Sequence, residues 1–439
     1  MNKRIKSLAM VAQLGWLGMS LNAWATDLLD VYHLATDNDP RIHIARSTLD
    51  ATLENEPLAR SRLLPGVSLG GDASLLYSNS DGRFGSQEES FGKYGLSLNL
   101  KQALYHKEYW ARLAAAGYQV AGAQADYIAA RQDLIIRVAR AYFDVLSARD
   151  TLRFTRAERQ ANKRQLEQAR QRFDVGLIAI TDVHEAKAGY DASVAAAITA
   201  ENALDNAREA LREIVGEFDD DDLAALKKHI DLNRPTPEDI DAWKHTALEQ
   251  NPNIISTRNK MLAARENVEV ERAGHYPTLD LVGQLGLDRS DSSLGSDTDS
   301  GSIGVQLAIP LYTGGAVSAA TRQAAARYQG AKDGLEQAMR ATTRGVRDAY
   351  RGVLSSISEV LALKAGTVSA RSALDATEAG FRVGTRTSVD VLISQRRLYQ
   401  AERDYAKARY TYLLNTLRLK QAAGTLSEQD LEAVNALLE

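Results

Sequence analysis

The distribution of apolar positions divides this chain into long stretches with a helical period and four short stretches with a strand period. After Pro65, and again after Pro277, the apolar residues change from a spacing of three or four to every second position. Such alternation predicts strands with one apolar face. We therefore expect β-hairpins at about residues 66–103 and 277–312. Their alternating sets are, in chain order, Val67, Leu69, Gly71, Ala73, Leu75 and Tyr77; Tyr94, Leu96, Leu98 and Leu100; Leu279, Leu281, Gly283, Leu285 and Leu287; and Ile303, Val305, Leu307, Ile309 and Leu311.

Strands of roughly ten residues, joined by loops rich in Ser, Gly and charge, are typical of a transmembrane β-barrel. The alternative is a half-buried sheet of a water-soluble protein. Four strands cannot close a barrel, because the smallest barrels have about eight. An open edge inside lipid would leave backbone groups without hydrogen bonds. A barrel therefore requires several copies of the chain: two would give eight strands, and three would give twelve and leave room for a channel.

Each predicted hairpin is followed by a very long helical stretch, at about residues 107–174 and 316–382. Prolines are absent between Pro65 and Pro235 and after Pro310, so nothing interrupts these helices. At 1.5 Å per residue, each is on the order of 100 Å long. Shorter stretches before the hairpins, 27–64 and 238–276, are each predicted as one helix. Coiled-coil seams with small residues are spaced by four and three at Leu134, Val138, Ala141, Val145, Ala148 and Leu152, and at Ala406, Tyr410, Leu413 and Leu417.

One turn sequence occurs twice, as FDVGLIAITDVHEAKA from Phe173 and as FRVGTRTSVDVLISQR from Phe381, at an offset of 208 residues. In each copy a helix reaches Val and ends at Gly, and a hydroxyl residue then opens the next helix. Gly provides the positive φ that ends a helix, and Thr or Ser provides an N-cap. We expect Thr181, and Thr387 or Ser388, to be these caps, with each turn joining two antiparallel helices.

The repeated turn, the paired prolines and the paired hairpins indicate an internal duplication. We expect a first structural repeat at residues 26–217, a connector at 218–237, a second repeat at 238–426 and a C-terminal tail at 427–439. Each repeat would contain, in order, a helix, a β-hairpin, a long helix, a turn and a returning helix. The predicted turns lie at residues 175–181 and 383–388. The acidic run FDDDD in the connector is interpreted as a solvated turn without a ligand.

The N-terminus has the pattern of a secretory signal peptide: basic MNKRIK, an apolar stretch and Ala-Trp-Ala before residue 26. We expect residues 1–25 to be removed; a membrane anchor is the alternative, but the apolar stretch is too short to span. No other stretch is expected to form a transmembrane helix. Cysteine is absent, the seven histidines are scattered, and no phosphate-binding loop, nucleophile motif or basic patch occurs. We therefore expect no enzyme, no cofactor, no metal site and no nucleic-acid partner.

The paired turns and several other stretches closely resemble the TolC family of outer-membrane export ducts. The matching stretches are VGLIAITDV, ENALDNAREALREI, VGTRTSVDVL and the tail NTLRLKQAAGTLSEQDLEAVNALL. The resemblance covers essentially the whole chain after the signal peptide, and the absence of cysteine resembles the branch without a lipid anchor. It implies an α+β membrane protein: a homotrimer whose twelve-stranded outer-membrane β-barrel, four strands from each chain, continues into a long periplasmic α-helical barrel. It also implies, as partners, a periplasmic adaptor protein and an inner-membrane ABC or RND translocase, with the barrel in outer-membrane lipid.

The resemblance also assigns roles at the turns. It implies a closed periplasmic entrance in which Phe381 and Arg386 are linked to Thr181 and Asp182, and in which Asp390 lines the constriction as an acidic ring. Three carboxylates around a narrow axis would attract cations. The residues by themselves favour a local role equally: Thr387 and Asp390 fit a capping box, and Asp182 in the first turn of a helix suits the helix dipole.

The chain departs from the family pattern at two positions. Phe381 stands where the family has a tyrosine, so no hydroxyl can bond Asp182. Ile393 stands where a second acidic ring would be, so one ring and a weaker hold on multivalent cations are expected. The tips of the turns resemble the adaptor-docking surface of the family, although helix–turn geometry alone accounts for their glycines; these tip residues are Val175, Gly176, Leu177, Val383, Gly384 and Thr385.

The leading interpretation is an export duct that passes proteins or small toxic compounds to the outside and takes its energy from the translocase. The alternatives are a trimeric coiled-coil adhesin or stalk with a membrane anchor, and a soluble periplasmic scaffold. An anchored stalk would place all its strands at one end of the chain, whereas strands are predicted here in both halves.

Overall fold

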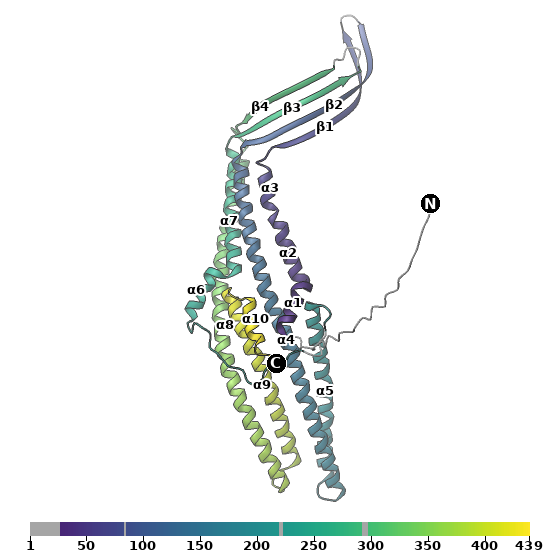
Figure 1. The fold of residues 1–439 in the computed structure, drawn as a ribbon, viewed down its shortest axis with the longest axis vertical. Coiled ribbons are helices and arrows are strands. Elements are labelled where there is room, and N and C mark those ends of the chain that lie inside the picture. The colour runs from purple at the N-terminus through teal and green to yellow at the C-terminus, as the bar shows by residue number, and fades with distance from the viewer. Residues whose placement is uncertain (1–26, 83–84, 219–222, 292–296) are drawn as a thin grey trace, which may run out of the picture.

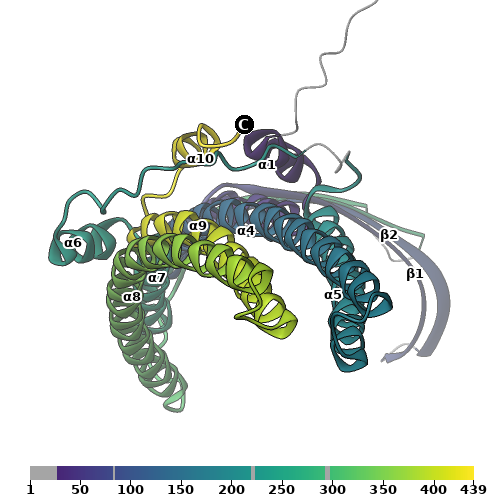
Figure 2. The ribbon, with the colours of Figure 1, turned by 90° about the horizontal axis from the view of Figure 1, so that it is seen from below.

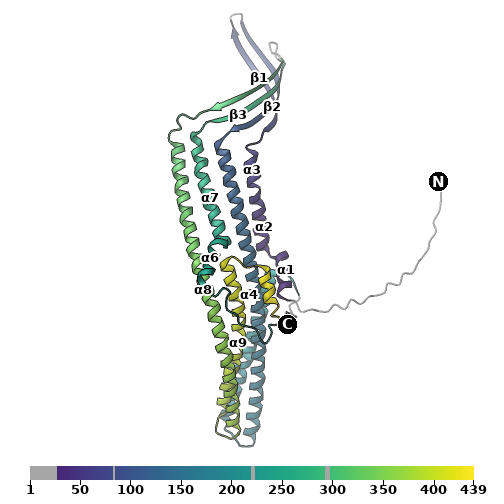
Figure 3. The same ribbon diagram turned by 60° about the vertical axis from the view of Figure 1, so that its left-hand side comes forward.

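The computed structural model describes residues 27–82, 85–218, 223–291 and 297–439. The predicted signal peptide lies outside these residues. The chain is strongly elongated, with a tilted β-sheet at one end and antiparallel helices along the rest of its length (Figure 1). Both helical turns lie at the end opposite the sheet, and the C-terminus lies near the middle (Figure 3).

The sheet has four antiparallel strands in the order β1-β2-β3-β4, so strands from both halves of the sequence form one sheet. The strands are β1 (Gly66–Gly82), β2 (Gly85–Tyr105), β3 (Thr278–Ser290) and β4 (Thr298–Ala308). In the described sheet, β1 and β4 each have one edge without a partner strand. Both predicted hairpins are present.

The pairing register aligns the predicted apolar sets across the sheet. Leu98 of β2 stands opposite Leu69 of β1 and Leu285 of β3, and Leu281 of β3 stands opposite Val305 of β4. Because alternate residues share a face, all four sets lie on one side of the sheet. Most of this side is exposed in the single chain. A continuous exposed apolar face of this kind requires an apolar surrounding or a partner surface.

The strand lengths differ from the prediction. β1 and β2 contain 17 and 21 residues rather than about ten, and most of the predicted loop between Ser78 and Gly92 belongs to these strands. Cross-strand hydrogen bonds extend the hairpin through its polar sequence, since backbone pairing does not depend on apolar side chains. β4 is shorter than expected and ends at Ala308, because Pro310 cannot donate to a neighbouring strand.

The two long helices have the predicted bounds. They are α4 (Lys107–Asp174), with 68 residues, and α8 (Ala316–Arg382), with 67 residues. Each turns back into a shorter helix, α5 (Ile180–Val215) or α9 (Ser388–Ala423). Seen along the axis, these four helices form a curved wall, with α5 near one edge and α8 at the other (Figure 2).

The helices next to the sheet are broken where single helices were predicted. The first stretch forms α1 (Leu28–Asn38), α2 (Pro40–Leu53) and α3 (Asn55–Ser61), and the second forms α6 (Ile240–Gln250), α7 (Pro252–Arg272) and a short 3₁₀ turn, Ala273–His275. Asp39 and Asn251 each cap a helix that begins at the following proline. Proline is favoured at the first helical position and lacks the amide that a continuous helix needs, so it starts a new helix.

The largest apolar cluster lies half-way along the wall, where the connector and α10 (Glu428–Asn435) cover its convex side (Figure 2). Tyr142 donates a hydrogen bond from its hydroxyl to the carbonyl oxygen of Ala224, at 2.8 Å, and Phe143 stacks on Tyr410 with 5.7 Å between ring centroids. Away from this cluster, each long helix is held mainly by packing along the helices beside it: α4 contacts α5, α7 and α9, and α8 contacts α7 and α9.

One described helix, α8, contains an 18-residue stretch with a mean hydropathy of 1.2, of which 17% is buried within the chain. By length and composition it could cross a membrane, so the expectation that no second stretch reaches this level was wrong. The stretch belongs to a helix of 67 residues that packs along α7 and α9.

Candidate functional site at the helical tips

The two helical turns have nearly the same backbone geometry. Gly176 and Gly384 have φ values of 76° and 81°, in the left-handed region that favours glycine. The amide of Leu177 donates to the carbonyl of Arg172 at 2.8 Å, and the equivalent bond in the second turn has a length of 2.9 Å. These bonds satisfy the last carbonyls of α4 and α8 and fold the chain back at once.

The tips expose apolar side chains to solvent. Val175, Leu177 and Val383 are 69%, 70% and 74% exposed, although valine and leucine are usually buried. A Cβ atom added to Gly176 or Gly384 would meet nothing within 4 Å. The tip residues are therefore placed as an open surface at the end of the molecule.

The second turn leads into a capping box at the start of α9. The amide of Thr387 donates to Oδ2 of Asp390 at 2.9 Å, and the amide of Asp390 donates to Oγ1 of Thr387 at 3.2 Å. Hydrogen bonds from the Thr387 amide and hydroxyl, and then the charge of Arg386, lower the pKa of Asp390 below its ordinary value of 3.8. The predicted cap at Thr387 is confirmed.

The first turn lacks such a cap. α5 begins at Ile180, its N-cap residue is Ala179, and no side chain bonds the first amides. Thr181 is already inside the first turn, beyond the position from which a hydroxyl accepts from the second or third helical amide. The prediction that Thr181 caps this helix was therefore wrong. Asp182 lies in the first turn as expected, where its negative charge suits the positive end of the helix dipole.

A crevice of about 430 Å³ lies between the two tips and brings several predicted residues together. Asp182, Phe381, Arg386, Leu177 and Gly384 all line it, with side chains from both hairpins on its walls. Arg386 packs close to the last turn of α8, since a Cβ atom on Gly380 would lie 2.7 Å from Cγ of Arg386. Gly380 therefore makes room for Arg386 beside α8.

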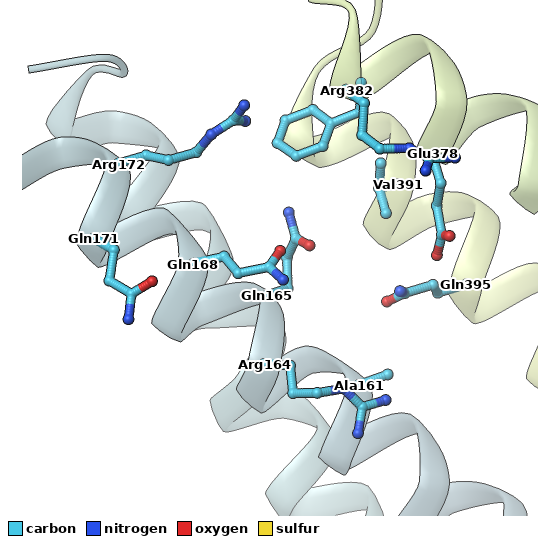
Figure 4. A pocket seen from close by; sticks show the side chains of 11 residues that line it. Ala161, Arg164, Gln165, Gln168, Gln171, Arg172, Glu378, Arg382, Val391 and Gln395 are labelled. Atoms are coloured by element: carbon cyan, nitrogen blue, oxygen red, sulfur yellow. The ribbon is translucent and has the colours of Figure 1, made fainter. Parts of the chain in front are cut away.

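A second cavity, of about 490 Å³, continues the crevice toward the middle of the molecule (Figure 4). Arg172, Gln168 and Gln165 extend from α4 toward Arg382 and Glu378 on the opposite helix pair. Amides and guanidinium groups dominate its lining, so the two helix pairs meet here across a polar gap. Around this cavity, few apolar side chains join the α4–α5 pair to the α8–α9 pair.

Arg172 of the first hairpin contacts Phe381 of the second hairpin at this end. Its guanidinium carbon lies 4.7 Å from the centre of the Phe381 ring, within the range of a cation–π interaction. Arg172 was not among the residues predicted from the sequence. The turn motif gives no signal that separates Arg172 from the neighbouring Arg170, because the contact depends on how the two hairpins pack.

The single chain does not join every predicted pair. Among the described residues, no hydrogen bond or ion pair links Arg386 to Thr181 or Asp182. Asp390 bonds Thr387 within its own turn, and Thr181 is exposed. Within the described ranges, no group of three or more His, Asp or Glu side chains could hold a metal ion. In the described part of the tips, the crevice and the cavity separate two hairpins and contain no set of groups for covalent chemistry.

Comparison with known proteins gives one family. The family model described as outer membrane efflux protein matches residues 31–217 and 243–425. The chain is 40% identical to the outer membrane protein TolC of Vibrio cholerae, over 100% of this chain and 99% of that protein. It is 32% identical to the alkaline protease secretion protein AprF of Pseudomonas aeruginosa, over 94% of this chain and 88% of the relative.

Solved structures show the same fold at lower identity. The Campylobacter jejuni CmeC outer membrane channel matches with a TM-score of 0.80 and 18% identity, over 100% of this chain and 98% of that one. The Vibrio cholerae outer membrane protein VceC matches with a TM-score of 0.79 and 21% identity, over 90% of this chain and 96% of that one.

Proposed function

This chain belongs to the outer membrane efflux protein family, and from that premise we propose that three copies form a gated export duct that works with a periplasmic adaptor and an inner-membrane translocase. The protein is an outer-membrane channel that extends into the periplasm and exports proteins and small toxic compounds. It acts as a passive channel rather than an enzyme, so the translocase supplies the energy. The two family matches support two structural repeats, at residues 26–217 and 238–426, joined by a connector at 218–237 and followed by a tail at 427–439.

One observation carries the proposal: a sheet with an exposed apolar face and two free edges stands on an open, curved wall of helices (Figures 1 and 2). A sheet with free edges cannot remain open in lipid, because its backbone groups would lack partners. If β4 of one copy pairs with β1 of the next, three copies give a closed barrel of twelve strands. The threefold arrangement of copies that closes the barrel also closes the curved helical wall into a tunnel.

The tips are proposed as the gate of this tunnel. Asp390 would form one acidic ring at the constriction, and Arg386 and Phe381 would hold the second hairpin against Thr181 and Asp182. Two observations support this role: the crevice brings Asp182, Phe381 and Arg386 together, and the polar gap above it leaves the hairpins weakly attached. The capping role of Asp390 is compatible with the gate, because a carboxylate with a lowered pKa stays charged.

The exposed tips are proposed as the adaptor-docking surface. This surface comprises Val175, Gly176, Leu177, Val383, Gly384 and Thr385. Their apolar side chains are open to solvent at the end of the molecule, which suits contact with another protein. The stalk or adhesin alternative is not favoured, since strands from both halves of the chain form one sheet.

The test is single-channel recording in a planar bilayer, with the wild type compared with Arg386→Ser and Asp390→Ala. A small cation-selective conductance that increases with Arg386→Ser and loses selectivity with Asp390→Ala supports the gated duct. Correctly assembled protein that forms no channel rejects the duct. A large channel that neither substitution changes would retain the duct and reject this gate.

A further inference from the structure

The long helices α4 and α8 correspond residue by residue at the same offset of 208 that relates the two turns. Several buried positions on α4 match buried positions on α8 in the middle of the wall, as in Val138 and Val346, Tyr142 and Tyr350, and Val145 and Val353. If a residue of α4 contacts a given element within the chain, the residue of α8 that lies 208 positions later is therefore expected to contact the equivalent element of the other repeat. At the open edge of the wall, that partner must come from another copy.

On α4, a groove is covered by the end of α9 and the residues that follow it. Ile128, Arg131, Gln132 and Ile135 line one side, and the segment that starts at Leu426 lines the other. Gln132 donates from Nε2 to the carbonyl oxygens of Gly424, at 2.9 Å, and Leu426, at 3.1 Å. This side chain satisfies carbonyl groups that the end of α9 leaves without helical partners.

On α8, the groove at the same positions is open. Glu336, Met339, Arg340 and Thr343 stand 208 residues after the α4 set and line a groove of about 450 Å³. The groove continues along α8 through further arginines. We call Arg340, Arg344, Arg347 and Arg351 the arginine stripe; all four residues are exposed.

Two of the four positive charges of the arginine stripe are not paired within the described chain. Arg340 pairs with Glu336 at 2.7 Å, and Arg351 lies 3.9 Å from Asp348. Arg344 and Arg347 have no ion-pair partner among the described residues. On α4 the corresponding positions of the stripe are Gln132, Ile136, Ala139 and Phe143, which are all buried. The stripe therefore occupies positions that are covered in the equivalent half of the chain.

The element that would cover it is the C-terminal end of α5. This helix ends at Gly216 with φ 78°, as α9 ends at Gly424 with φ 80°, and the two glycines are 208 residues apart. Its last turns contain Glu209, which pairs with Arg212, and Glu213, and Glu217 follows. The end of a helix also carries partial negative charge. Within one chain this end lies far across the wall from α8 (Figure 2).

The surroundings of the two glycines agree with this equivalence. A Cβ atom on Gly424 would meet the backbone of Gln250 and Asn251, and one on Gly216 would meet Asn38. Both partners are in the junction before a proline-started helix, α7 or α2. The ends of α5 and α9 thus have matching contacts inside their own repeats, and only the contact of α5 with a long helix is missing.

We propose that the arginine stripe of α8 binds the C-terminal end of α5 from a neighbouring copy. The contact between copies is then electrostatic at positions where the equivalent residues of α4, Gln132, Ile136, Ala139 and Phe143, are uncharged and buried. This inference rests on the proposed trimer. Arg340 takes the place of Gln132 and donates to the carbonyls of Gly216 and Phe218, while Arg344 and Arg347 face Glu209 and Glu213. Charged edges keep the free chain soluble and oppose misaligned pairing, because like charges then meet.

A cross-linking experiment tests the contact, and the chain has no natural cysteine that could interfere. The variant combines Arg340→Cys with Glu217→Cys and is treated with a short bis-maleimide, because an arginine–glutamate pair holds its Cα atoms farther apart than a disulfide permits. The expected result is a covalent trimer on a denaturing gel. The matched control combines Arg371→Cys, on the order of 45 Å farther along α8, with Glu217→Cys and should remain monomeric.

Charge reversal tests the energetic role. Arg344→Glu with Arg347→Glu should weaken trimer assembly roughly tenfold at low salt, and Glu209→Arg with Glu213→Arg added to that variant should restore much of the loss. Lys163→Glu, an exposed cation elsewhere on α4, serves as the control. If the wild type is a trimer, but the Arg340→Cys, Glu217→Cys variant does not cross-link and the charge reversal does not weaken assembly, the inference is overturned and the duct stands. A wild type that is monomeric under all conditions overturns the trimer itself.

Discussion

Arg172 lies over the aromatic ring of Phe381, so a cation on the first hairpin contacts the residue that replaces the tyrosine of the family pattern on the second. An exposed cation–π contact contributes about 0.5–1 kcal/mol. We expect Phe381→Leu to remove this contribution, to loosen the two hairpins and to raise the open probability of the duct. Single-channel recording measures the change.

Arg172→Ala should have the same effect as Phe381→Leu, and the double variant should add little, because both substitutions remove one contact. Arg170→Ala, which removes a neighbouring exposed cation, is the control. Strictly additive effects of the two single substitutions would show that the contact does not hold the hairpins.

The start of α9 should become sensitive to acid at a lower pH than an ordinary aspartate predicts. The capping hydrogen bonds lower the folded-state pKa of Asp390 below 3.8, so its stabilising effect is complete above pH 3.8 and is lost as the pH falls through the lowered value. Amide hydrogen exchange of the peptide around Thr387, corrected for the intrinsic pH dependence, measures the opening of this turn.

Two comparisons make this prediction specific. Asp390→Asn should expose the amide of Thr387 at every pH, since a neutral side chain is the weaker acceptor. The start of α5, which has no side-chain cap, should exchange faster than the start of α9 near neutral pH. Equal protection of the two helix starts would contradict the capping role.

His106 and Asp280 should stabilise the junction between the sheet and the long helices. Nε2 of His106 lies 3.0 Å from Oδ1 of Asp280, and both side chains are almost buried where β2 leads into α4. Asp280→Ala leaves a buried polar ring without its partner and should cost about 1–3 kcal/mol. Thermal unfolding of the assembled protein in detergent measures the loss.

Asp288→Ala is the matched control on the same strand. Asp288 lies 3.8 Å from Lys93, and both side chains are nearly half exposed, so its removal should have little effect. If the two substitutions lower the unfolding temperature equally, the buried pair has no special role at the junction.

Two glycines with almost the same φ should differ in their tolerance of alanine. At Gly384, with φ 81°, a Cβ atom meets nothing within 4 Å, so Gly384→Ala should cost only backbone strain, about 1 kcal/mol. At Gly424, with φ 80°, the Cβ atom would lie 2.6 Å from the Asn251 backbone. Gly424→Ala should therefore be clearly more destabilising, and urea unfolding compares the two variants.

The fold was predictable wherever one periodic pattern continued without interruption. The bounds of α4 and α8 could be read from the absence of proline and from the glycine turns, and the strand faces could be read from alternation. The breaks at Asp39 and Asn251 were also visible, because each residue precedes a proline and can cap the next helix. The prediction of single helices gave too much weight to helical periodicity and too little to the cap.

The candidate site was less predictable, because its geometry depends on packing between distant segments. The Thr387 cap follows from local spacing, and the same reasoning failed at Thr181 because α5 starts at Ile180, two residues earlier than a cap at Thr181 requires. The contact of Arg172 with Phe381 joins residues far apart in sequence, and no local pattern contains it. The arginine stripe became visible only when its positions were compared with buried positions on α4.

Only α4 and α8 continue from the sheet to the tips, whereas α5 and α9 end at Gly216 and Gly424, about half-way along the wall. If α9 moves when the proposed gate opens, its own helical backbone transmits the movement no farther than Gly424. The part of the wall beside the membrane consists of separate helices next to α4 and α8: α2 and α7, which start at prolines, and α3, which starts at Asn55. Among the described residues, these helices share no backbone hydrogen bonds with α5 or α9. In the proposed gate, opening would then move mainly the distal half of the wall, and the sheet in the outer membrane could keep its shape through each transport cycle.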